Sequence, residues 1–249
     1  MFDLHGRTAV VTGAGQNVGA GIAKALASQG AAVGVNDFIP ERAQSVAAEI
    51  IAAGGNAVSV AFDVTNYDAV VSGMTAFADA LGPIDILVNN AGNGGTQQMR
   101  PTQFRDSTPE SWRGPIDVNL YGVMNCARAV INPMVERQWG RIITIASGAG
   151  TAGLNIGVSA YAGGKGGAIS FMRHLAIENA RLGVTANSLA LGLMHIDNPE
   201  VTANLSRSIP VGRVGTPEDI AAACVWLASN EASWVTGQTI QINGGVTTT

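Results

Sequence analysis

Residues 8–19 read TAVVTGAGQNVG, and the helical pattern AGIAKALASQG follows over residues 20–30. The first five residues form a short apolar strand pattern, after which come Gly13, Gly15 and Gly19. A strand, a glycine-rich turn and a helix make a phosphate-binding unit, because glycines let the backbone approach a pyrophosphate and the helix N-terminus offers free N–H groups. This stretch therefore predicts an α/β fold that binds a dinucleotide.

An acidic residue closes the next strand pattern. The run AAVGVND ends at Asp37, close to the offset of about 20 residues at which an acid binds the adenosine ribose. Its carboxylate would accept hydrogen bonds from the ribose hydroxyls and repel a 2′-phosphate, so we expect NAD rather than NADP as the cofactor. The nearest cation, Arg42, is expected on the solvated face of the following helix. The alternative for Asp37 is a helix N-cap ahead of Pro40.

Apolar runs alternate with helical patterns along the chain. Strand patterns recur near residues 7–12, 31–36, 57–62, 84–89, 141–146, 184–189 and 239–242, and helical patterns near residues 18–29, 40–53, 66–81, 116–138, 159–180 and 216–229. This alternation predicts a Rossmann fold, in which a doubly wound parallel β-sheet of about seven strands carries helices on both faces. Neither a linker nor a repeat interrupts the pattern, so residues 1–249 are expected to form a single domain.

A tyrosine and a lysine stand four residues apart at Tyr161 and Lys165, and Ser147 lies upstream at the end of a strand pattern. On a helix, the first two side chains project from one face. A nearby ammonium favours the phenolate, so we expect Lys165 to lower the pKa of Tyr161 toward the range of a general acid or base. Ser147 would hold a carbonyl or alcohol oxygen against the phenol. The alternative is an ordinary helix with a Tyr and a Lys at this spacing.

Six motifs, in order along the chain, resemble the short-chain dehydrogenase/reductase family from about Leu4 to Gly245. They are Thr12-Gly13-Ala14-Gly15-x-x-x-Gly19, Asp63-Val64, Asn89-Asn90-Ala91-Gly92, the series Asn119, Ser147, Tyr161 and Lys165, then Val235-Thr236-Gly237-Gln238 and Asn243-Gly244-Gly245. The resemblance implies that the catalytic residues are Asn119, Ser147, Tyr161 and Lys165. It implies cofactor contacts from Gly13, Gly15, Asn17, Val18, Gly19, Asp37, Phe38, Asp63, Val64, Asn90, Ala91, Gly92, Tyr161, Lys165, Gly192 and Met194.

The chain departs from the family pattern at several positions. Asn17 stands where the family usually has a third glycine, and Asn tolerates a left-handed backbone better than most residues. Leu191 stands where proline is usual, and Ile196 stands where a threonine often contacts the cofactor. Gly114 and Pro115 interrupt the expected start of the helix that carries Asn119, although proline is well tolerated at a first helical position.

The resemblance implies hydride transfer between a nicotinamide cofactor and a small secondary alcohol or ketone, with Tyr161 as the general acid and base. Asn119 would form the inner end of a proton relay, for which local hydrogen bonding of a helix asparagine is the alternative. The alternative activity is reduction of a 3-oxoacyl thioester. A non-catalytic dinucleotide-binding regulator is the alternative of another class, and it would be expected to lack Tyr161 or Lys165.

The substrate is expected among residues 93–108, 148–159 and 193–210. These segments contain the apolar side chains Met99, Leu154, Ile156, Leu193, Met194 and Ile196, which weakly favour a cyclic or aliphatic secondary alcohol. His195 stands beside them and is expected to be solvated.

Composition narrows the class of protein. With 249 residues and 47% hydrophobic side chains, the chain can bury a sizeable core. Its net charge of −4 argues against nucleic acid or an anionic membrane as a partner. No metal-ligand cluster stands in the sequence, and the two cysteines, Cys126 and Cys224, are expected to stay reduced. The N-terminal residues lack an apolar signal region, and no run of about 18 apolar residues occurs, so we expect a cytoplasmic protein.

Glycines crowd the helical pattern that contains Tyr161. Gly163, Gly166 and Gly167 fall with Ser170 and His174 on the side opposite the tyrosine at about 100° per residue. Glycine inside a helix costs roughly 1 kcal/mol relative to alanine, and close approach of another helix can offset that cost. Together with the family's common association, this face predicts a homo-oligomer, either a dimer or a tetramer. The alternative is that it packs against a helix of the same chain.

Overall fold

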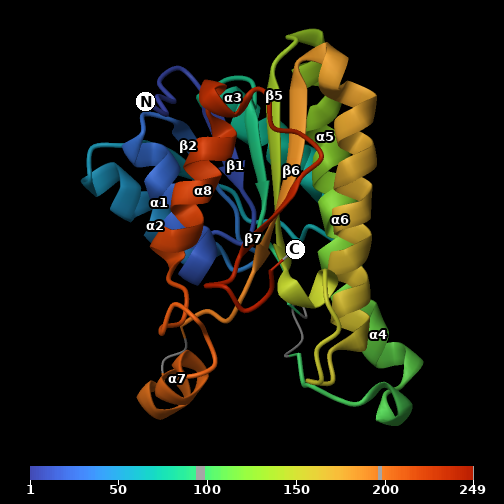
Figure 1. Cartoon of the computed structure of the whole chain (residues 1–249). Coiled ribbons are helices and arrows are strands. Elements are labelled where there is room, and N and C mark those ends of the chain that lie inside the picture. The colour runs from blue at the N-terminus through green and yellow to red at the C-terminus, as the bar shows by residue number, and fades with distance from the viewer. Residues whose placement is uncertain (94–98, 196–197, 249) are drawn as a thin grey trace.

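A seven-stranded β-sheet forms the framework of the computed structural model, which describes residues 1–93, 99–195 and 198–248 (Figure 1). The strands are β1 (Thr8–Val11), β2 (Ala32–Val35), β3 (Asn56–Ser59), β4 (Ile86–Asn89), β5 (Gly140–Ser147), β6 (Val184–Leu191) and β7 (Thr239–Ile242). Their order is β3-β2-β1-β4-β5-β6-β7, and every neighbouring pair is parallel. The predicted parallel, doubly wound sheet is confirmed.

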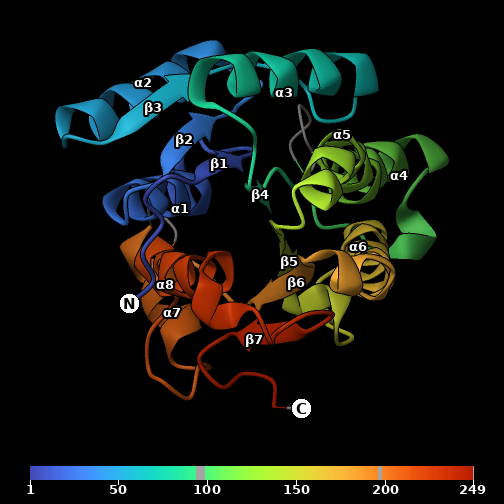
Figure 2. The same cartoon turned by 90° about the horizontal axis from the view of Figure 1, so that it is seen from above.

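Helices cover both faces of the sheet (Figure 2). They are α1 (Asn17–Ser28), α2 (Pro40–Ala52), α3 (Tyr67–Leu81), α4 (Pro109–Ile116), α5 (Gly122–Glu136), α6 (Ser159–Asn179), α7 (Pro199–Ser206) and α8 (Pro217–Ala228). Buried side chains of α1, α2 and α8 pack on one face, and those of α3, α5 and α6 pack on the other. This is the Rossmann arrangement that the alternating sequence pattern predicts.

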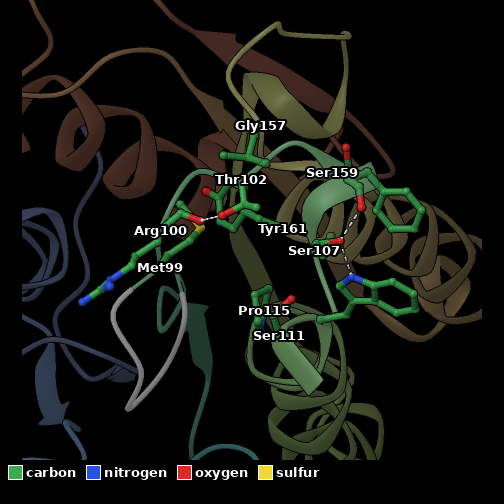
Figure 3. A pocket seen from close by; sticks show the side chains of 13 residues that line it. Met99, Arg100, Thr102, Ser107, Ser111, Pro115, Gly157, Ser159 and Tyr161 are labelled. Atoms are coloured by element: carbon green, nitrogen blue, oxygen red, sulfur yellow. Dashed lines mark hydrogen bonds between the residues drawn. The ribbon is translucent and has the colours of Figure 1, made fainter. Parts of the chain in front are cut away.

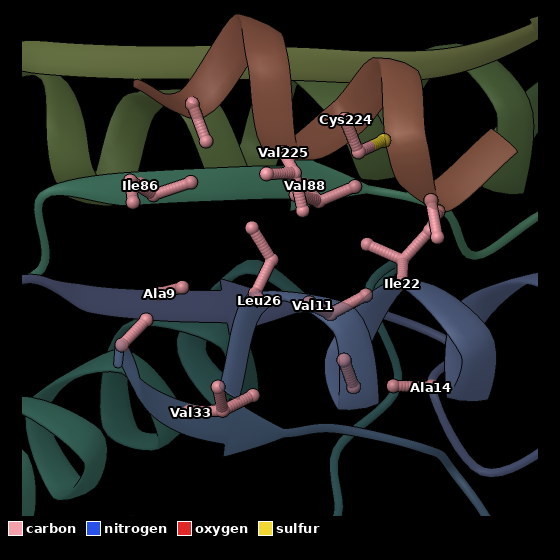
Figure 4. Close-up of a cluster of buried hydrophobic side chains, with 14 of the residues drawn as sticks. Ala9, Val11, Ala14, Ile22, Leu26, Val33, Ile86, Val88, Cys224 and Val225 are labelled. Atoms are coloured by element: carbon pink, nitrogen blue, oxygen red, sulfur yellow. The ribbon is translucent and has the colours of Figure 1, made fainter. Parts of the chain in front are cut away.

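Successive side chains of each central strand bury against opposite helix layers. In β1, Ala9 and Val11 pack in the cluster formed with α1 and α8 (Figure 4), whereas Val10 packs in the cluster on the other face. In β4, Val88 and Leu87 divide in the same way. Each fully buried Val or Leu side chain stabilises the fold by about 1.5–3 kcal/mol. Because helices cover both faces of the sheet, a functional site is expected at the ends of the strands.

The strand order reverses beside β1. From β1 the chain first adds β2 and β3 on one side, then crosses to add β4 to β7 on the other. In folds of this kind a crevice forms at the carboxyl ends of the strands where the order reverses. Helices α4 and α7 lie on that side of the sheet (Figure 1).

The predicted helix over residues 116–138 is wrong at its start. Pro115, expected to interrupt the start of this helix, lies inside α4, which begins at Pro109. A π-helical turn over Asp117–Tyr121 then joins α4 to α5. Within this wider turn, the side-chain amide of Asn119 donates a hydrogen bond of 2.7 Å to the Pro115 carbonyl.

Helix α7 is absent from the sequence-based expectations, although its start carries a readable signal. Asn198 accepts a hydrogen bond from the N–H of Val201, and Pro199 occupies the first helical position. Ile196, one of the departures from the family pattern, lies outside the described residues.

Candidate active site

A cleft of about 1130 Å³ opens at the carboxyl ends of the strands. It gathers most of the residues expected to act, namely Gly13, Asn17, Val18, Gly19, Asp37, Phe38, Asp63, Val64, Asn90, Ala91, Gly92, Ser147, Tyr161, Lys165, Gly192 and Met194. Gly15 and Asn119 are the two expected residues that do not line it. Residues from distant parts of the sequence thus meet because parallel strands end at one edge of the sheet.

The glycine-rich turn leaves the N-terminus of α1 open toward the cleft. Gly13 and Asn17 adopt positive φ angles of 59° and 47°, so Asn17 accepts the left-handed backbone expected of it. Gln16 precedes α1 without a side-chain capping hydrogen bond, and no acidic residue stands in the first turn. Free N–H groups and the positive end of the helix dipole therefore face a space where a pyrophosphate fits.

Asp37 fastens this turn to the end of β2. One carboxylate oxygen accepts the N–H of Gly15 at 3.2 Å, and the other accepts the N–H of Ile39 at 3.0 Å. Helix α2 begins at Pro40 with Ile39 as its N-cap, so the alternative that Asp37 is the N-cap residue is wrong. An ionised carboxylate has about four acceptor positions, which leaves capacity for ribose hydroxyls.

Arg42 does not lie where the sequence pattern places it. It is half-buried and lines the cleft, rather than standing on the fully solvated face of α2. The Cβ of Arg42 lies 2.5 Å from the position that a Cβ on Gly15 would occupy, so the residue packs directly against the glycine-rich turn. The cleft therefore has one guanidinium-bearing residue close to Asp37.

The end of β4 is bound to the end of β1. The side-chain amide of Asn90 donates to the carbonyls of Thr12 and Gly13 at 3.0 Å and 2.8 Å. In return, the hydroxyl of Thr12 accepts the N–H groups of Asn90 and Ala91 at 3.0 Å and 3.1 Å. These bonds fix the floor of the cleft, and they explain why an amide side chain follows β4.

Ser147, Tyr161 and Lys165 converge on the opposite wall. Ser147 is the last residue of β5, while α6 carries Tyr161 and Lys165. Lys165 is only 4% exposed, and its Nζ donates a hydrogen bond of 2.6 Å to the carbonyl of Ile145. The same Nζ lies 5.9 Å from the centroid of the Tyr161 ring. The arrangement can hold an oxygen between a serine hydroxyl and a phenol.

The expectation that Lys165 lowers the pKa of Tyr161 is wrong for this structure. Burial raises the pKa of the Tyr161 phenol, and a hydrogen bond with Ser147 opposes the rise. Burial also lowers the pKa of Lys165 to about 8, which leaves the ammonium charged at neutral pH. The Lys165 ammonium donates to the Ile145 carbonyl, and the raised pKa of Tyr161 favours the protonated phenol.

Asn119 lies fully buried behind Lys165. Its amide donates to the carbonyls of Asn93 and Pro115, each at 2.7 Å, while its Oδ1 has no hydrogen-bond partner among the residues that the structure describes. A Cβ at Gly92 would lie 3.0 Å from that Oδ1 and 3.1 Å from Lys165 Nζ. The Asn119 amide group thus bonds locally to Pro115 and across the fold to Asn93, so local hydrogen bonding accounts for only part of this side chain. The missing side chain at Gly92 leaves a small polar space between Asn119 and Lys165.

The apolar residues expected to hold the substrate divide between surface and cavity. Leu154, Ile156 and Leu193 are 47%, 52% and 40% exposed, and they line neither this cleft nor the smaller cavity beside it. Met194 lines the cleft, and Met99 lines both spaces.

Some residues of the cleft escape the sequence-based expectations. His195 is exposed, as expected, and it also lines the cleft, as do Gln16, Asn36 and Leu191. Gln16 and Asn36 directly adjoin recognised motif positions or a strand end, which is the signal that could have found them.

The described part of the chain contains neither a metal-binding cluster nor a membrane-spanning helix. No group of three or more His, Cys, Asp or Glu side chains there could hold a metal ion. Among the helices of residues 1–93, 99–195 and 198–248, none is both long and apolar enough to cross a membrane.

Comparison with known proteins agrees with this geometry. A family model described as enoyl-(acyl carrier protein) reductase matches residues 13–247. The chain is 36% identical to a 3-oxoacyl-[acyl-carrier-protein] reductase from Vibrio cholerae over 98% of its own length and 99% of the relative's. The chain therefore belongs to the short-chain dehydrogenase/reductase family, as its motifs indicate.

Other relatives differ in the substrates they are named for. The chain is 38% identical to subunit BbsD of (2S)-[(R)-hydroxy(phenyl)methyl]succinyl-CoA dehydrogenase from Thauera aromatica, over 97% of each protein. A solved gluconate 5-dehydrogenase from Burkholderia cenocepacia, in complex with NADP and tartrate, superposes with a TM-score of 0.90 at 33% identity, covering 98% of this chain and 96% of that one. These relatives support an oxidoreductase and leave its substrate and its choice of NAD or NADP open.

Proposed function

We propose that this protein interconverts a secondary alcohol and a ketone, with NAD(H) as the redox partner and Tyr161 as the general acid and base. The observation that carries the proposal is the meeting of Ser147, Tyr161 and Lys165 in the cleft that also receives the open N-terminus of α1. A regulator without activity would have no need of this set of side chains. A bound nicotinamide would supply the hydride in one direction and accept it in the other.

Each residue has a separate task. Ser147 orients the substrate oxygen with its hydroxyl, and Tyr161 gives that oxygen a proton or takes one from it. Lys165 provides a buried positive charge beside the site and, by family resemblance, holds the nicotinamide ribose. The space between Asn119 and Lys165 would hold a water molecule of the proton relay, which supports the role that the resemblance implies for Asn119.

The experiment that tests the proposal mixes the protein with NADH or NADPH and a panel of ketones. The readout is the absorbance of the reduced nicotinamide, followed by chromatography of the alcohol produced. Loss of reduced cofactor with an equal amount of alcohol formed is the expected result. Binding of cofactor without turnover of any ketone or alcohol would instead favour the non-catalytic regulator.

A second candidate activity is reduction of a 3-oxoacyl thioester. The relative from Vibrio cholerae is named for that activity, and its match spans nearly the whole chain. Comparing kcat/KM for a 3-oxoacyl thioester with that for a simple ketone separates the two candidates. A kcat/KM at least about 100-fold higher for the thioester would select the second.

The pH dependence follows from the raised pKa of Tyr161. Ketone reduction needs the protonated phenol, so its rate should stay level through neutral pH and fall only in the alkaline range. Alcohol oxidation needs the phenolate, so its rate should rise as the pH increases above neutrality. Both profiles are to be measured where a deuterated substrate shows that hydride transfer limits the rate. A level profile for oxidation from neutral to alkaline pH would contradict the role of Tyr161.

Assembly is proposed to be a homo-oligomer, either a dimer or a tetramer, formed in part through α6. Only part of the glycine face is available, because a Cβ on Gly167 would meet Leu120 of the same chain at 3.2 Å. At Gly167, the glycine face packs against a residue of the same chain, as the alternative to a subunit contact states. Gly163, Ser170 and His174 remain exposed.

We expect Ser170→Glu to weaken the assembly, because two-fold symmetry would place like charges near each other. Light scattering would show a smaller mass for this variant than for the unaltered protein. Ser72→Glu, which adds the same charge on an exposed position of α3, is the matched control and should leave the mass unchanged. A monomeric unaltered protein would refute the assembly outright.

A further inference from the structure

A second cavity lies beside the cleft and shares Tyr161 and Met99 with it (Figure 3). Its volume is about 300 Å³. A cavity of about 150 Å³ is enough to hold benzene, so this one has room for a ring together with the carbons that join it to a reacting centre. Because Tyr161 lines both spaces, a substrate whose oxygen contacts the phenol can place one substituent in the smaller cavity.

Two backbone segments form its upper wall. The N–H of Thr102 donates a hydrogen bond of 2.7 Å to the carbonyl of Gly157. Gly157 has a positive φ of 68°, and a Cβ there would lie 3.0–3.1 Å from the backbone of Thr102. This close contact joins the segment before α4 to the segment before α6, so the position of this wall is fixed by a backbone hydrogen bond and close packing.

A stacked aromatic pair forms another part of the lining. The rings of Phe104 and Trp112 lie 5.0 Å apart at an interplanar angle of 20°. The indole N–H of Trp112 donates to the hydroxyl of Ser107 at 2.8 Å, and that hydroxyl donates to the Phe104 carbonyl at 2.7 Å. The polar edge of Trp112 is therefore satisfied within the chain, and the rings offer a ligand apolar surface.

Charge is nearly absent from the cavity. Among the described residues that line it, Arg100 is the only charged one. Its guanidinium points away from the hydroxyls and rings of the cavity in Figure 3. The hydroxyls of Thr102, Ser107 and Ser111 already donate to backbone carbonyls. A carboxylate or phosphate held there would therefore lose its water with few partners to replace it, which is costly, whereas an uncharged group would not.

We propose that this cavity selects substrates in which an uncharged ring is attached next to the carbonyl or carbinol carbon, with Phe104 and Trp112 as the residues that determine the preference. This inference rests on the proposed alcohol–ketone activity and specifies its substrate class. Acyclic ketones would react through the same Tyr161 without the contact to the rings.

The test compares reduction of acetophenone with that of butan-2-one, each with the preferred cofactor. We expect kcat/KM for acetophenone to be higher by at least about tenfold, and Trp112→Ala to remove most of that preference. Trp112→Phe, which keeps an aromatic ring, should retain most of it. Trp234→Ala is the matched control, because Trp234 is 97% exposed and lines neither space.

Phe104→Ala gives an independent measurement if Trp112→Ala does not fold, because Phe104 lies at the rim and is 56% exposed. A Trp112 or Phe104 variant that slows both ketones equally, or an unaltered protein without preference for acetophenone, would overturn the inference while leaving the proposed activity intact. Faster reduction of 2-oxobutanoate, abolished by Arg100→Ala, would also overturn it. Failure of both ketones with both cofactors, despite cofactor binding, refutes the proposed function itself.

Discussion

Tyr161→Phe is expected to lower turnover by about 10²-fold or more while the fold and the affinity for cofactor persist. The substitution removes only the hydroxyl, so the ring still occupies its place between the cleft and the smaller cavity. What disappears is the group that moves a proton to or from the substrate oxygen. Turnover is measured at saturating cofactor, and affinity is measured by the fluorescence of bound reduced nicotinamide.

The control for this variant is Tyr67→Phe. Tyr67 begins α3, is 42% exposed and lines neither cavity, so losing its hydroxyl should change neither turnover nor affinity. If Tyr161→Phe retained near-normal turnover, the assigned acid–base role would be wrong. If it lost cofactor affinity along with turnover, the residue would act in binding instead.

NAD(H) is expected to exceed NADP(H) in kcat/KM by about 10²-fold, since a few kcal/mol of repulsion corresponds to that ratio. The reason is the carboxylate of Asp37, which lines the cleft at the end of β2 where a 2′-phosphate would add a second negative group. The two cofactors are to be compared with one ketone at one ionic strength. Comparable values would refute the preference.

Two variants separate the causes of this preference. Asp37→Ser should narrow the ratio by removing the repulsion, although the loss of the hydrogen bonds to Gly15 and Ile39 will also weaken the turn. Arg42 lies in the same part of the cleft and would attract a phosphate, so Arg42→Ala should widen the ratio. If the ratio of kcat/KM for NAD(H) to that for NADP(H) were unchanged in both variants, neither side chain would discriminate between a 2′-hydroxyl and a 2′-phosphate.

The sequence predicts the sheet and the cleft well because each depends on local patterns. Central strands such as β1, which contains Val10, carry apolar side chains on both faces because helices cover both faces of the sheet. Such continuous apolar runs are easily recognised in a sequence. Once the strands are parallel, topology alone brings Asp37, Asn90 and Ser147 to one edge. No side-chain geometry is needed for that inference.

The start of α4 escapes prediction because two prolines compete for one role. Pro109 and Pro115 each suit a first helical position, and the local signal for Pro109 is the preceding N-cap residue Thr108, which forms a capping box with Ser111. Contacts from elsewhere in the chain bear on the choice: a Cβ on Gly164 of α6 would lie 2.9 Å from the Pro115 carbonyl, so α6 packs closely on the end of α4. Tertiary packing of this kind acts together with the local capping signal.

The pKa shift of Tyr161 and the second cavity could not be predicted from the sequence for a related reason. The direction of the pKa shift at Tyr161 depends on how deeply the phenol is buried, and sequence spacing carries no measure of that depth. Phe104 and Trp112 are eight positions apart, which is not a spacing that pairs two side chains on a helix face. A short turn over Phe104–Asp106 brings their rings together.

The central claim is that the cleft transfers a hydride to the carbon whose oxygen Tyr161 protonates. The most direct measurement uses NADH carrying deuterium at the transferable position of the nicotinamide, with mass spectrometry of the alcohol formed from a ketone. The account predicts one deuterium on the carbinol carbon for each cofactor oxidised, and near-complete loss of this product with Tyr161→Phe. An alcohol without deuterium, or cofactor that binds and is never oxidised by any ketone, would contradict it.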